Sequence, residues 1–232
     1  MYCNKHFTAI VLAAGSGSRM KSDIPKQYMK LGGKEVLYYS LKAFQDSIVD
    51  DIILVTRKDD IDFCRHDIID KYHFDKVKAV VEGGSERYWS VKRGLEISEG
   101  SDYVLIHDGA RPCVNNDIIH RIMEEVLKCN ACTAGVPVKD TIKLTDDNDF
   151  GIETPRRDRL WQVQTPQAFL YEEISRAYDE LGKDDGNGVT DDTMIVERYI
   201  GRRSKMVFGE YTNIKITTPE DILIAEIFLE KS

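Results

Sequence analysis

The chain has 232 residues, which is long enough to bury a substantial core, and we expect one α/β domain over residues 1–232. Its 32 basic and 40 acidic residues give a net charge of −8, which argues against general binding to nucleic acids or anionic membranes. A site for a phosphorylated ligand must therefore be built from a few local cations.

The five cysteines are scattered, and no secretory segment precedes them. No apolar run reaches the roughly 18 residues that a transmembrane helix needs. We therefore expect a cytoplasmic protein with reduced thiols. Cys129 and Cys132 form a CxxC at the end of a helical pattern, but two cysteines are too few for a tetrahedral metal site, so we interpret them as free thiols.

The first apolar run, residues 7–12, predicts a buried strand, and the small residues of AAGSGSRM follow it directly. Small residues at the carboxyl end of a strand let backbone N–H groups approach an anion closely. Arg19 and Lys26 add positive charge beside Gly15 and Gly17. This combination predicts a phosphate-binding loop.

Strand and helix patterns then alternate along the chain. The expected strands are 51–56, 77–81, 103–106 and 134–138. The expected helices lie near 37–44, 61–69, 88–95 (opened by Ser85) and 118–126 (capped from 115–117). Repeated strand–helix units predict a three-layer, mainly parallel twisted sheet.

Residues 139–159 interrupt this alternation. A turn signal at 146–149 separates two short segments that alternate like strands, 141–145 and 150–154, which predicts a β-hairpin. A hairpin alone is marginally stable, so we expect this arm to project into a partner subunit of a homodimer.

The remaining elements complete the predicted domain. The chain resumes with residues 160–164, and we then expect a helix near 170–181, a helix opened by residues 190–192 and a strand at 205–208. Thr218 is expected to cap the last helix through its hydroxyl, with Pro219 at the first helical position.

Several motifs in order resemble one family. They are AAGSGSRM, PKQY, EGGSERYWSV, HDGARP, VPVKDTIK, QTPQAF, VTDD and TNIKITTPED, spanning about residues 8–228. Together they resemble the 2-C-methyl-D-erythritol 4-phosphate cytidylyltransferases of the non-mevalonate isoprenoid pathway. The resemblance implies a Rossmann-like nucleotidyltransferase fold, CTP and a polyol phosphate as substrates, and Mg²⁺ as cofactor.

The resemblance also implies site residues. Those expected to bind CTP are Ala13, Ala14, Gly15, Gly17, Arg19, Lys26, Gly84, Ser85, Ser90 and Asp108. Those expected to bind the acceptor are Asp108, Arg111, Thr141, Arg157, Thr165 and Lys215. The catalytic subset is Arg19, Lys26, Arg157 and Lys215. Thr141, Arg157 and Thr165 are expected to come from the arm region of a second subunit, and Arg87 receives less weight.

The chemistry of cytidylyl transfer agrees with this set. A phosphate oxygen of the acceptor attacks the α-phosphorus of CTP and pyrophosphate leaves, so positioning and electrostatic stabilisation matter more than a protein nucleophile. Arg19 can fork onto two phosphate oxygens and Lys26 can act as a point charge. Asp108 is the candidate carboxylate for Mg²⁺, and no metal ligand is assigned.

Some of these residues also have ordinary structural interpretations. His107 is expected to be structural, and Trp89 and Trp161 are expected to be core residues. Arg157 lies in a basic run, so Arg156 competes with it for the acceptor. Lys215 lies in an alternating segment where a strand lysine would point to solvent.

Three other functions compete with the main one. A ribitol 5-phosphate cytidylyltransferase would share the Gly-rich loop, QTPQ and IKITTP, whereas VPVKDTIK and VTDD favour methylerythritol phosphate. A nicotinamide or flavin enzyme is disfavoured because Met20 replaces the third glycine of GxGxxG. A non-catalytic nucleotide-binding protein is disfavoured because both Arg19 and Lys26 are present.

Overall fold

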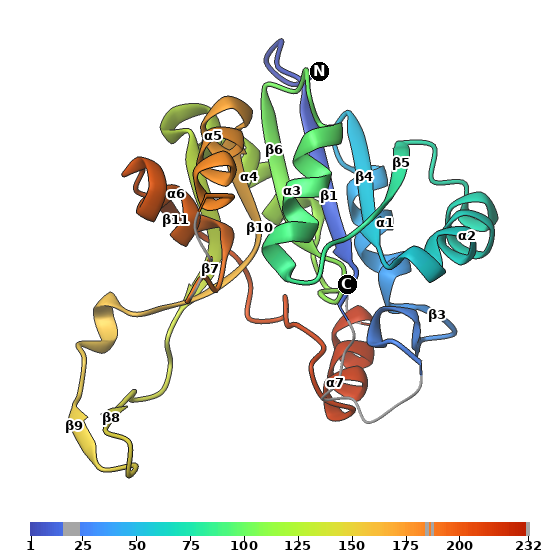
Figure 1. The fold of residues 1–232 in the computed structure, drawn as a ribbon. Coiled ribbons are helices and arrows are strands. Elements are labelled where there is room, and N and C mark those ends of the chain that lie inside the picture. Colours follow the sequence, from blue (N-terminus) through green and yellow to red (C-terminus); the bar gives the residue numbers. More distant parts are fainter. Residues whose placement is uncertain (16–23, 184–185, 187, 231–232) are drawn as a thin grey trace.

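The computed structural model describes residues 1–15, 24–183, 186 and 188–230. Its main sheet contains β1 (Phe7–Ala13), β4 (Asp51–Thr56), β5 (Val77–Glu82), β6 (Tyr103–Asp108), β7 (Ala131–Pro137), β10 (Trp161–Leu170) and β11 (Lys205–Phe208). Within these described residues the strand order is β11-β7-β10-β6-β1-β4-β5 (Figure 1). Among the described strands of this main sheet, only β10 pairs antiparallel, with β6 and β7, so the predicted mainly parallel sheet is confirmed.

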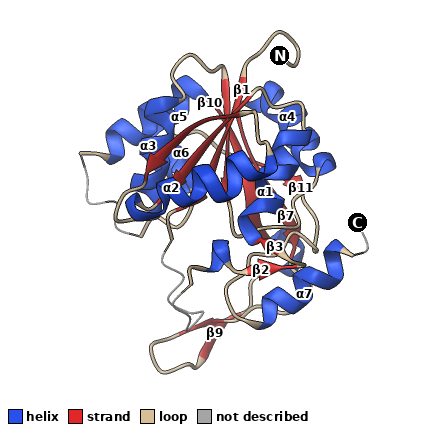
Figure 2. Ribbon diagram, turned by 90° about the vertical axis from the view of Figure 1, so that its right-hand side faces the viewer, coloured by secondary structure: helices blue, strands red, loops and turns tan. Residues whose placement is uncertain are grey.

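Helices cover both faces of the sheet and give three layers (Figures 1 and 2). One face carries α1 (Val36–Asp46), α2 (Ile61–Phe63) with its π-helical continuation (Cys64–Asp70), and α4 (Asn116–Cys129). The other carries α3 (Arg87–Ile97), α5 (Tyr171–Leu181) and α6 (Asp192–Ile200). In β1, Phe7 and Val11 join the first core and Ile10 joins the second. Successive strand side chains point to opposite faces, so an unbroken apolar strand requires both layers.

A smaller apolar cluster lies beside the main sheet. It brings together Leu31 of β2 (Lys30–Leu31) and Ala225 of α7 (Glu220–Leu229), and β2 pairs with β3 (Lys34–Glu35), which Figure 2 shows as a neighbour of α7. Ile216 is fully buried in this cluster. Because Ile216 directly follows Lys215, its burial anchors the loop that carries Lys215.

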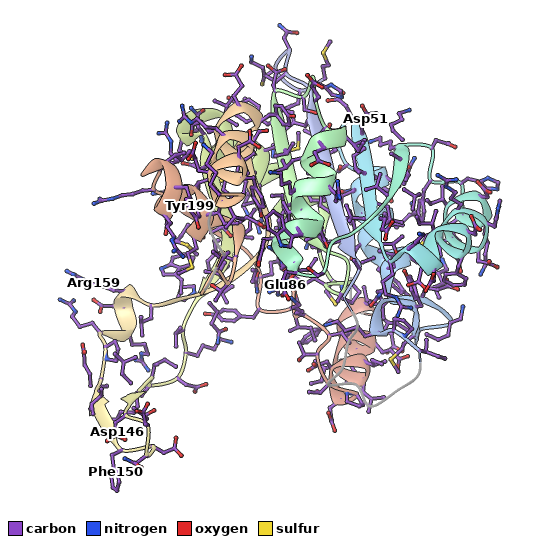
Figure 3. All side chains as sticks on the ribbon, in the orientation of Figure 1. Asp51, Glu86, Asp146, Phe150, Arg159 and Tyr199 are labelled. Atoms are coloured by element: carbon purple, nitrogen blue, oxygen red, sulfur yellow. The ribbon has the colours of Figure 1, made fainter. Side chains whose placement is uncertain are left out.

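The predicted hairpin is present as β8 (Leu144–Thr145) and β9 (Gly151–Glu153), which pair antiparallel. It projects away from the body of the molecule (Figures 1 and 3). All residues from 139 to 154 are exposed, including Phe150 at 72% and Ile152 at 68%. The hairpin therefore has no core of its own within this chain.

Several element boundaries match the sequence-based expectations. The strands predicted at 51–56 and 205–208 have the bounds of β4 and β11. The helices predicted near 170–181 and after residues 190–192 correspond to α5 and α6. Asn115 caps α4, because its side-chain oxygen accepts a hydrogen bond from the N–H of Ile118. No helix in the described part of the chain combines the length and apolarity needed to cross a bilayer.

Other local predictions were wrong. Helix α3 begins at Arg87 with Glu86 at its N-cap, so Ser85 does not open it. Ser85 instead belongs to the loop that lines a cavity described below. Trp89 and Trp161 are only half-buried, so they are not core residues.

The cap of α7 also differs from the prediction. Pro219 is its N-cap residue, and no side chain there makes a cap hydrogen bond. The carboxylate of Asp221 instead accepts hydrogen bonds from the backbone N–H groups of Thr217 and Thr218, at 2.7 and 2.8 Å. The acceptor for these N–H groups is thus a side chain in the first turn of the helix, and not the Thr218 hydroxyl that was expected to provide it.

Candidate active site

A cavity of about 340 Å³ lies at the carboxyl ends of β1 and β6. Ligands bind at this edge in open α/β sheets. Its lining residues are Leu12, Ala13, Ala14, Gly15, Lys26, Gln27, Gly84, Ser85, Glu86, Arg87, Ser90, Asp108, Ala110 and Lys215. The structure therefore brings together every predicted CTP-binding residue that it describes. Gly17 and Arg19 lie outside the described residues.

Buried Gln27 shapes the beginning of the phosphate-binding loop. Its amide nitrogen donates to the carbonyl oxygens of Ala13 and Gly15, at 2.6 and 3.2 Å. Because these carbonyls are already paired, they turn away from an incoming anion. Lys26 donates to the carbonyl of Ile216 at 2.8 Å, which connects this loop to the segment that carries Lys215.

The opposite wall of the cavity requires small residues. A Cβ on Gly84 would lie 2.2 Å from the Cβ of Trp89, closer than any real contact. The hydroxyl of Ser90 accepts a hydrogen bond from the N–H of Gly84 at 3.1 Å. The loop is thereby held close to α3, with exposed Ser85 at its tip.

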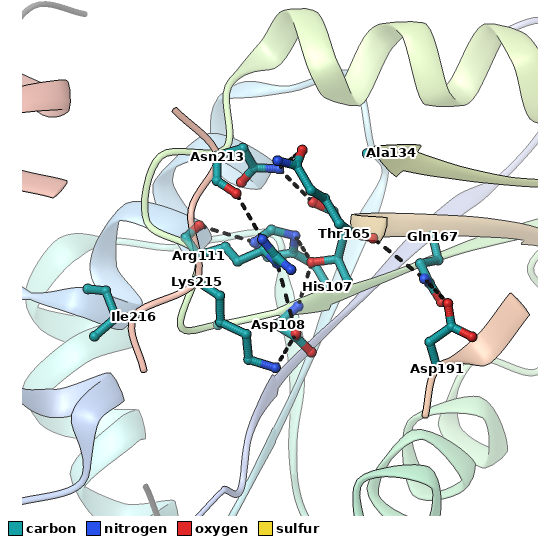
Figure 4. Close-up of polar contacts among 12 residues, drawn as sticks. His107, Asp108, Arg111, Ala134, Thr165, Gln167, Asp191, Asn213, Lys215 and Ile216 are labelled. Atoms are coloured by element: carbon teal, nitrogen blue, oxygen red, sulfur yellow. Dashed lines mark hydrogen bonds and ion pairs between the residues drawn. The ribbon is translucent and has the colours of Figure 1, made fainter. Parts of the chain in front are cut away.

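A charged group, which we call the junction, lies at the centre of the site. It consists of Arg87, Asp108, Arg111 and Lys215. Asp108 Oδ1 is 3.2 Å from Arg87 Nε, and Asp108 Oδ2 is 2.7 Å from Lys215 Nζ and 4.0 Å from Arg111 Nε. Figure 4 shows Lys215 and Arg111 converging on Asp108.

Three cations surround this one carboxylate. Burial opposes ionisation of Asp108, but the charges of Arg87, Lys215 and Arg111 outweigh it and hold its pKa well below the usual range. Asp108 is consequently ionised at every physiological pH. The junction as a whole keeps an excess of positive charge, which suits phosphate groups.

Arg87 is in turn held from behind by Asp192, the first residue of α6. The two guanidinium Nη atoms each lie 2.8 Å from a different carboxylate oxygen of Asp192. Asp192 is fully buried and also accepts a hydrogen bond from the hydroxyl of Tyr178 at 2.7 Å. Its backbone N–H donates to Gln167 Oε1 at 2.9 Å.

A second buried chain of hydrogen bonds supports Asp108 from β10. The hydroxyl oxygen of Thr165 accepts from the backbone N–H of Asp108 at 3.1 Å, so its hydrogen points to His107 Nδ1 at 3.0 Å. His107 Nε2 then donates to the carbonyl of Arg111 at 3.3 Å. Burial lowers the pKa of His107 to about 3, so the ring stays neutral. The structural role predicted for His107 is confirmed.

A second cavity, of about 450 Å³, adjoins the junction. Its lining residues are Arg87, Asp108, Arg111, Val163, Gln164, Thr165, Gln167, Thr190, Asp191, Thr193, Met194, Glu197 and Lys215. Arg87, Asp108 and Lys215 line both cavities. These three side chains therefore form the boundary between the cavities.

The predicted acceptor residues separate into two groups. Asp108, Arg111, Thr165 and Lys215 all lie at the second cavity. Thr165 was expected with the arm, and this was wrong: it is a buried residue of β10 in the same chain. The segment around Lys215 is a loop and not the strand that its alternation suggested.

Thr141 and Arg157 lie on the exposed arm and line neither cavity. Arg157 donates to the carbonyl of Lys139 at 3.0 Å, whereas Arg156 pairs with Asp158. The structure of one chain therefore does not bring the arm residues to the junction.

Sequence reasoning gave Arg87 little weight and assigned neither Asp192 nor Gln167 to the site. Arg87 and Asp192 are 105 positions apart, so no local spacing links them. The motifs EGGSERYWSV and VTDD contained both residues and were the available signal.

The residues present fit Mg²⁺ only as an ion carried by a phosphate ligand. No group of three His, Cys, Asp or Glu side chains that could hold a metal occurs among the described residues. Asp108 is ionised but already pairs with Arg87 and Lys215. Mg²⁺ often takes one carboxylate and fills its other positions with phosphates and water, which this arrangement permits.

Comparison with known proteins agrees with the site. A model of the family 2-C-methyl-D-erythritol 4-phosphate cytidylyltransferase (IspD) matches residues 7–231. Proteins of that name from Lachnospira eligens and Lachnoclostridium phytofermentans are 54% and 52% identical, over 96% and 97% of this chain and 99% and 96% of theirs. The crystal structure of 4-diphosphocytidyl-2C-methyl-D-erythritol synthase from Anaerococcus prevotii has a TM-score of 0.85 and 37% identity, covering 97% of this chain and 96% of that one. The chain therefore belongs to the 2-C-methyl-D-erythritol 4-phosphate cytidylyltransferase family and is a nucleotidyltransferase enzyme.

Proposed function

We propose that this chain transfers the cytidylyl group of CTP to 2-C-methyl-D-erythritol 4-phosphate, with CTP in the first cavity and the polyol phosphate in the second. The observation that carries the assignment is the shared boundary: Arg87, Asp108 and Lys215 line both cavities. An attacking phosphate and an α-phosphate must meet between their two binding sites, and a cationic boundary brings two polyanions together there.

The reaction needs no protein nucleophile. A phosphate oxygen of the acceptor forms a bond to the α-phosphorus of CTP, the bond to the β-phosphate oxygen breaks, and pyrophosphate leaves with the electron pair. Lys26 faces the first cavity and supports the charge that develops on the α-phosphate, together with Arg19. Lys215 holds the attacking phosphate at the boundary.

Arg111 adds a donor on the acceptor side. Its Nη1 donates to the carbonyl of Asn213 at 2.8 Å, whereas its buried Nε has no hydrogen-bond partner in the described part of the chain. A buried unpaired donor is costly, and a phosphate oxygen in the second cavity would satisfy it. Mg²⁺ would neutralise the triphosphate of CTP, with Asp108 as its protein ligand.

We further propose that the enzyme is a homodimer in which the arm of one protomer completes the acceptor site of the other. The exposed apolar side chains of the arm, such as Phe150 and Ile152, have no partner surface within the described residues of their own chain. Arm docking on a second copy would bury them and deliver Thr141 and Arg157 to the second cavity.

An assay of the purified protein with CTP, Mg²⁺ and either methylerythritol phosphate or ribitol 5-phosphate tests the reaction. We expect release of pyrophosphate and formation of the cytidine-diphosphate product with methylerythritol phosphate. A strong preference for ribitol 5-phosphate would refute the assignment of the acceptor. Turnover with neither compound would refute the function itself.

Light scattering at micromolar concentration tests the assembly separately. We expect the mass of two chains, and a variant that lacks residues 142–152 should have the mass of one. A monomeric wild-type protein would leave Thr141 and Arg157 without a site to complete.

A further inference from the structure

Arg87 has an arrangement that simple charge neutralisation does not require. Its Nη atoms form two parallel hydrogen bonds to Asp192, and its Nε points to Asp108. The plane of the guanidinium is thus set by Asp192, and the edge of the guanidinium that carries Nε faces Asp108. A planar guanidinium held at two atoms cannot rotate without breaking both bonds.

Asp192 is itself fixed by two other elements and by the cap of its own helix. Tyr178 from α5 donates to its carboxylate, Gln167 from β10 accepts from its backbone N–H, and Asp191 caps α6 just before it through the N–H of Met194. Asp192 is fully buried. A buried carboxylate with all its partners in place is a rigid support.

We propose that Asp192 is a positioning residue for cytidylyl transfer: it holds Arg87 in the boundary between the two cavities, so that Asp108 keeps one oxygen for Arg87 and the other for Lys215. This inference rests on the proposed function. It assigns a task to Asp192, which lies behind the boundary and lines neither cavity.

The reason lies in competition for one carboxylate. Asp108 has two oxygens, and the structure gives Oδ1 to Arg87 and Oδ2 to Lys215. Without the charge of Asp192, the fork of Arg87 is released and can take both oxygens of Asp108. Lys215 would then lose the partner that places its ammonium group between the substrates.

The test uses Asp192→Asn, a neutral variant of the same shape, in the full-length enzyme. We expect kcat to fall about tenfold or more, as for the loss of a charge-assisted hydrogen bond, with the KM for CTP changed less than about threefold. Glu173→Gln is the control, because Glu173 also holds an arginine by two hydrogen bonds, from Nε and Nη2 of Arg202, and neither residue lines the site. Its kcat should stay at the wild-type value.

A double-mutant cycle separates positioning from stability. If Asp192 acts through Arg87, Asp192→Asn should lower kcat no further in an Arg87→Gln background. The proposal would be overturned if the losses of kcat in the two single variants multiplied in the double variant. It would also be overturned if Asp192→Asn lowered the melting temperature but left the kcat of the folded enzyme unchanged. If Asp192→Asn does not fold, Tyr178→Phe removes one bond to the same carboxylate and should lower kcat about two- to fivefold only when Arg87 is present.

The wild-type rate distinguishes the two levels of failure. A wild-type enzyme that does not turn over CTP with methylerythritol phosphate refutes the proposed function. An active wild type whose Asp192→Asn variant keeps its kcat refutes the positioning role alone.

Discussion

The junction and the arm are both polar regions of this molecule, and they are built in opposite ways. Three junction residues, Arg87, Asp108 and Lys215, come from separate parts of the fold and, with Asp192 behind them, are linked by hydrogen bonds of 2.7–3.2 Å. In the arm, the bonds are local: the carboxylate of Asp146 accepts from N–H groups two and four residues away. The junction is supported by the core, whereas these bonds of the arm run between residues of the arm itself, as do those of Lys143 to Thr154 and Arg157 to Lys139.

This difference separates two kinds of functional residue. A charge that is fixed on several sides can hold a phosphate at a defined place, because the surroundings need not reorganise during the reaction. An exposed arm gains precision only when another surface immobilises it. The junction should therefore act as one rigid unit within a chain, whereas the arm should matter only in the assembly.

The largest effect on kcat is expected for Lys26→Ala, in the first cavity beside the junction. Removal of a charge that stabilises the transferred phosphate should lower kcat about 10²- to 10³-fold without unfolding the protein. Steady-state kinetics and a thermal melt measure the two quantities. Lys42→Ala, which removes an exposed lysine paired with Asp46 one turn later, is the control. Unchanged turnover in Lys26→Ala would remove its role in the transition state.

The arm is tested by Arg157→Ala beside Arg156→Ala. Loss of a hydrogen bond to a charged phosphate should lower kcat/KM for the acceptor about 10- to 100-fold in the first variant. Arg156 pairs with Asp158 at the surface, so its loss should change the rate less than about threefold. The reverse order would make Arg156 the residue that contacts the acceptor.

A pair of glycines compares the two regions directly. Gly84→Ala places a methyl group against Trp89, so we expect an about tenfold higher KM for CTP as the loop moves off α3. In the arm, a Cβ on Gly151 would meet nothing closer than 3.7 Å. Gly151→Ala should leave the KM for CTP unchanged. Equal effects in both variants would contradict the rigidity assigned to the cavity wall.

The smallest effect concerns stability against pH. An unfolded histidine binds a proton near pH 6.5, whereas the pKa of His107 in the folded protein is about 3. Between these values the unfolded state binds more protons, so the free energy of unfolding should fall as pH is lowered, by up to about 1.4 kcal/mol per pH unit.

Urea unfolding between pH 7 and 4.5 measures this slope. His107→Asn should be less stable at pH 7 but should show a shallower slope. His66→Gln changes an exposed side chain in the π-helical continuation of α2, and its stability should depend on pH as that of the wild type does. A wild-type slope in His107→Asn would mean that other groups produce the pH dependence.

Much of the architecture was predictable from local patterns. Apolar runs such as 51–56 and helical stripes such as 118–126 have only one way to bury their side chains, so their type and order follow from periodicity. The same holds for the hairpin, whose turn residues and exposed alternation are local features. Caps were less predictable, since Asp221 and Thr218 are both plausible partners for the same backbone groups.

The sequence by itself determined the alternating α/β order, the phosphate-binding loop at the end of the first strand and the family that its motifs resemble. Only the tertiary structure decided that Lys215 reaches Asp108 across 107 positions and that Arg87 turns its fork to Asp192. The physical reason is that strand order sets which side chains meet at one sheet edge. A carboxylate pairs with the cation that this topology places beside it, and no spacing along the chain encodes that choice.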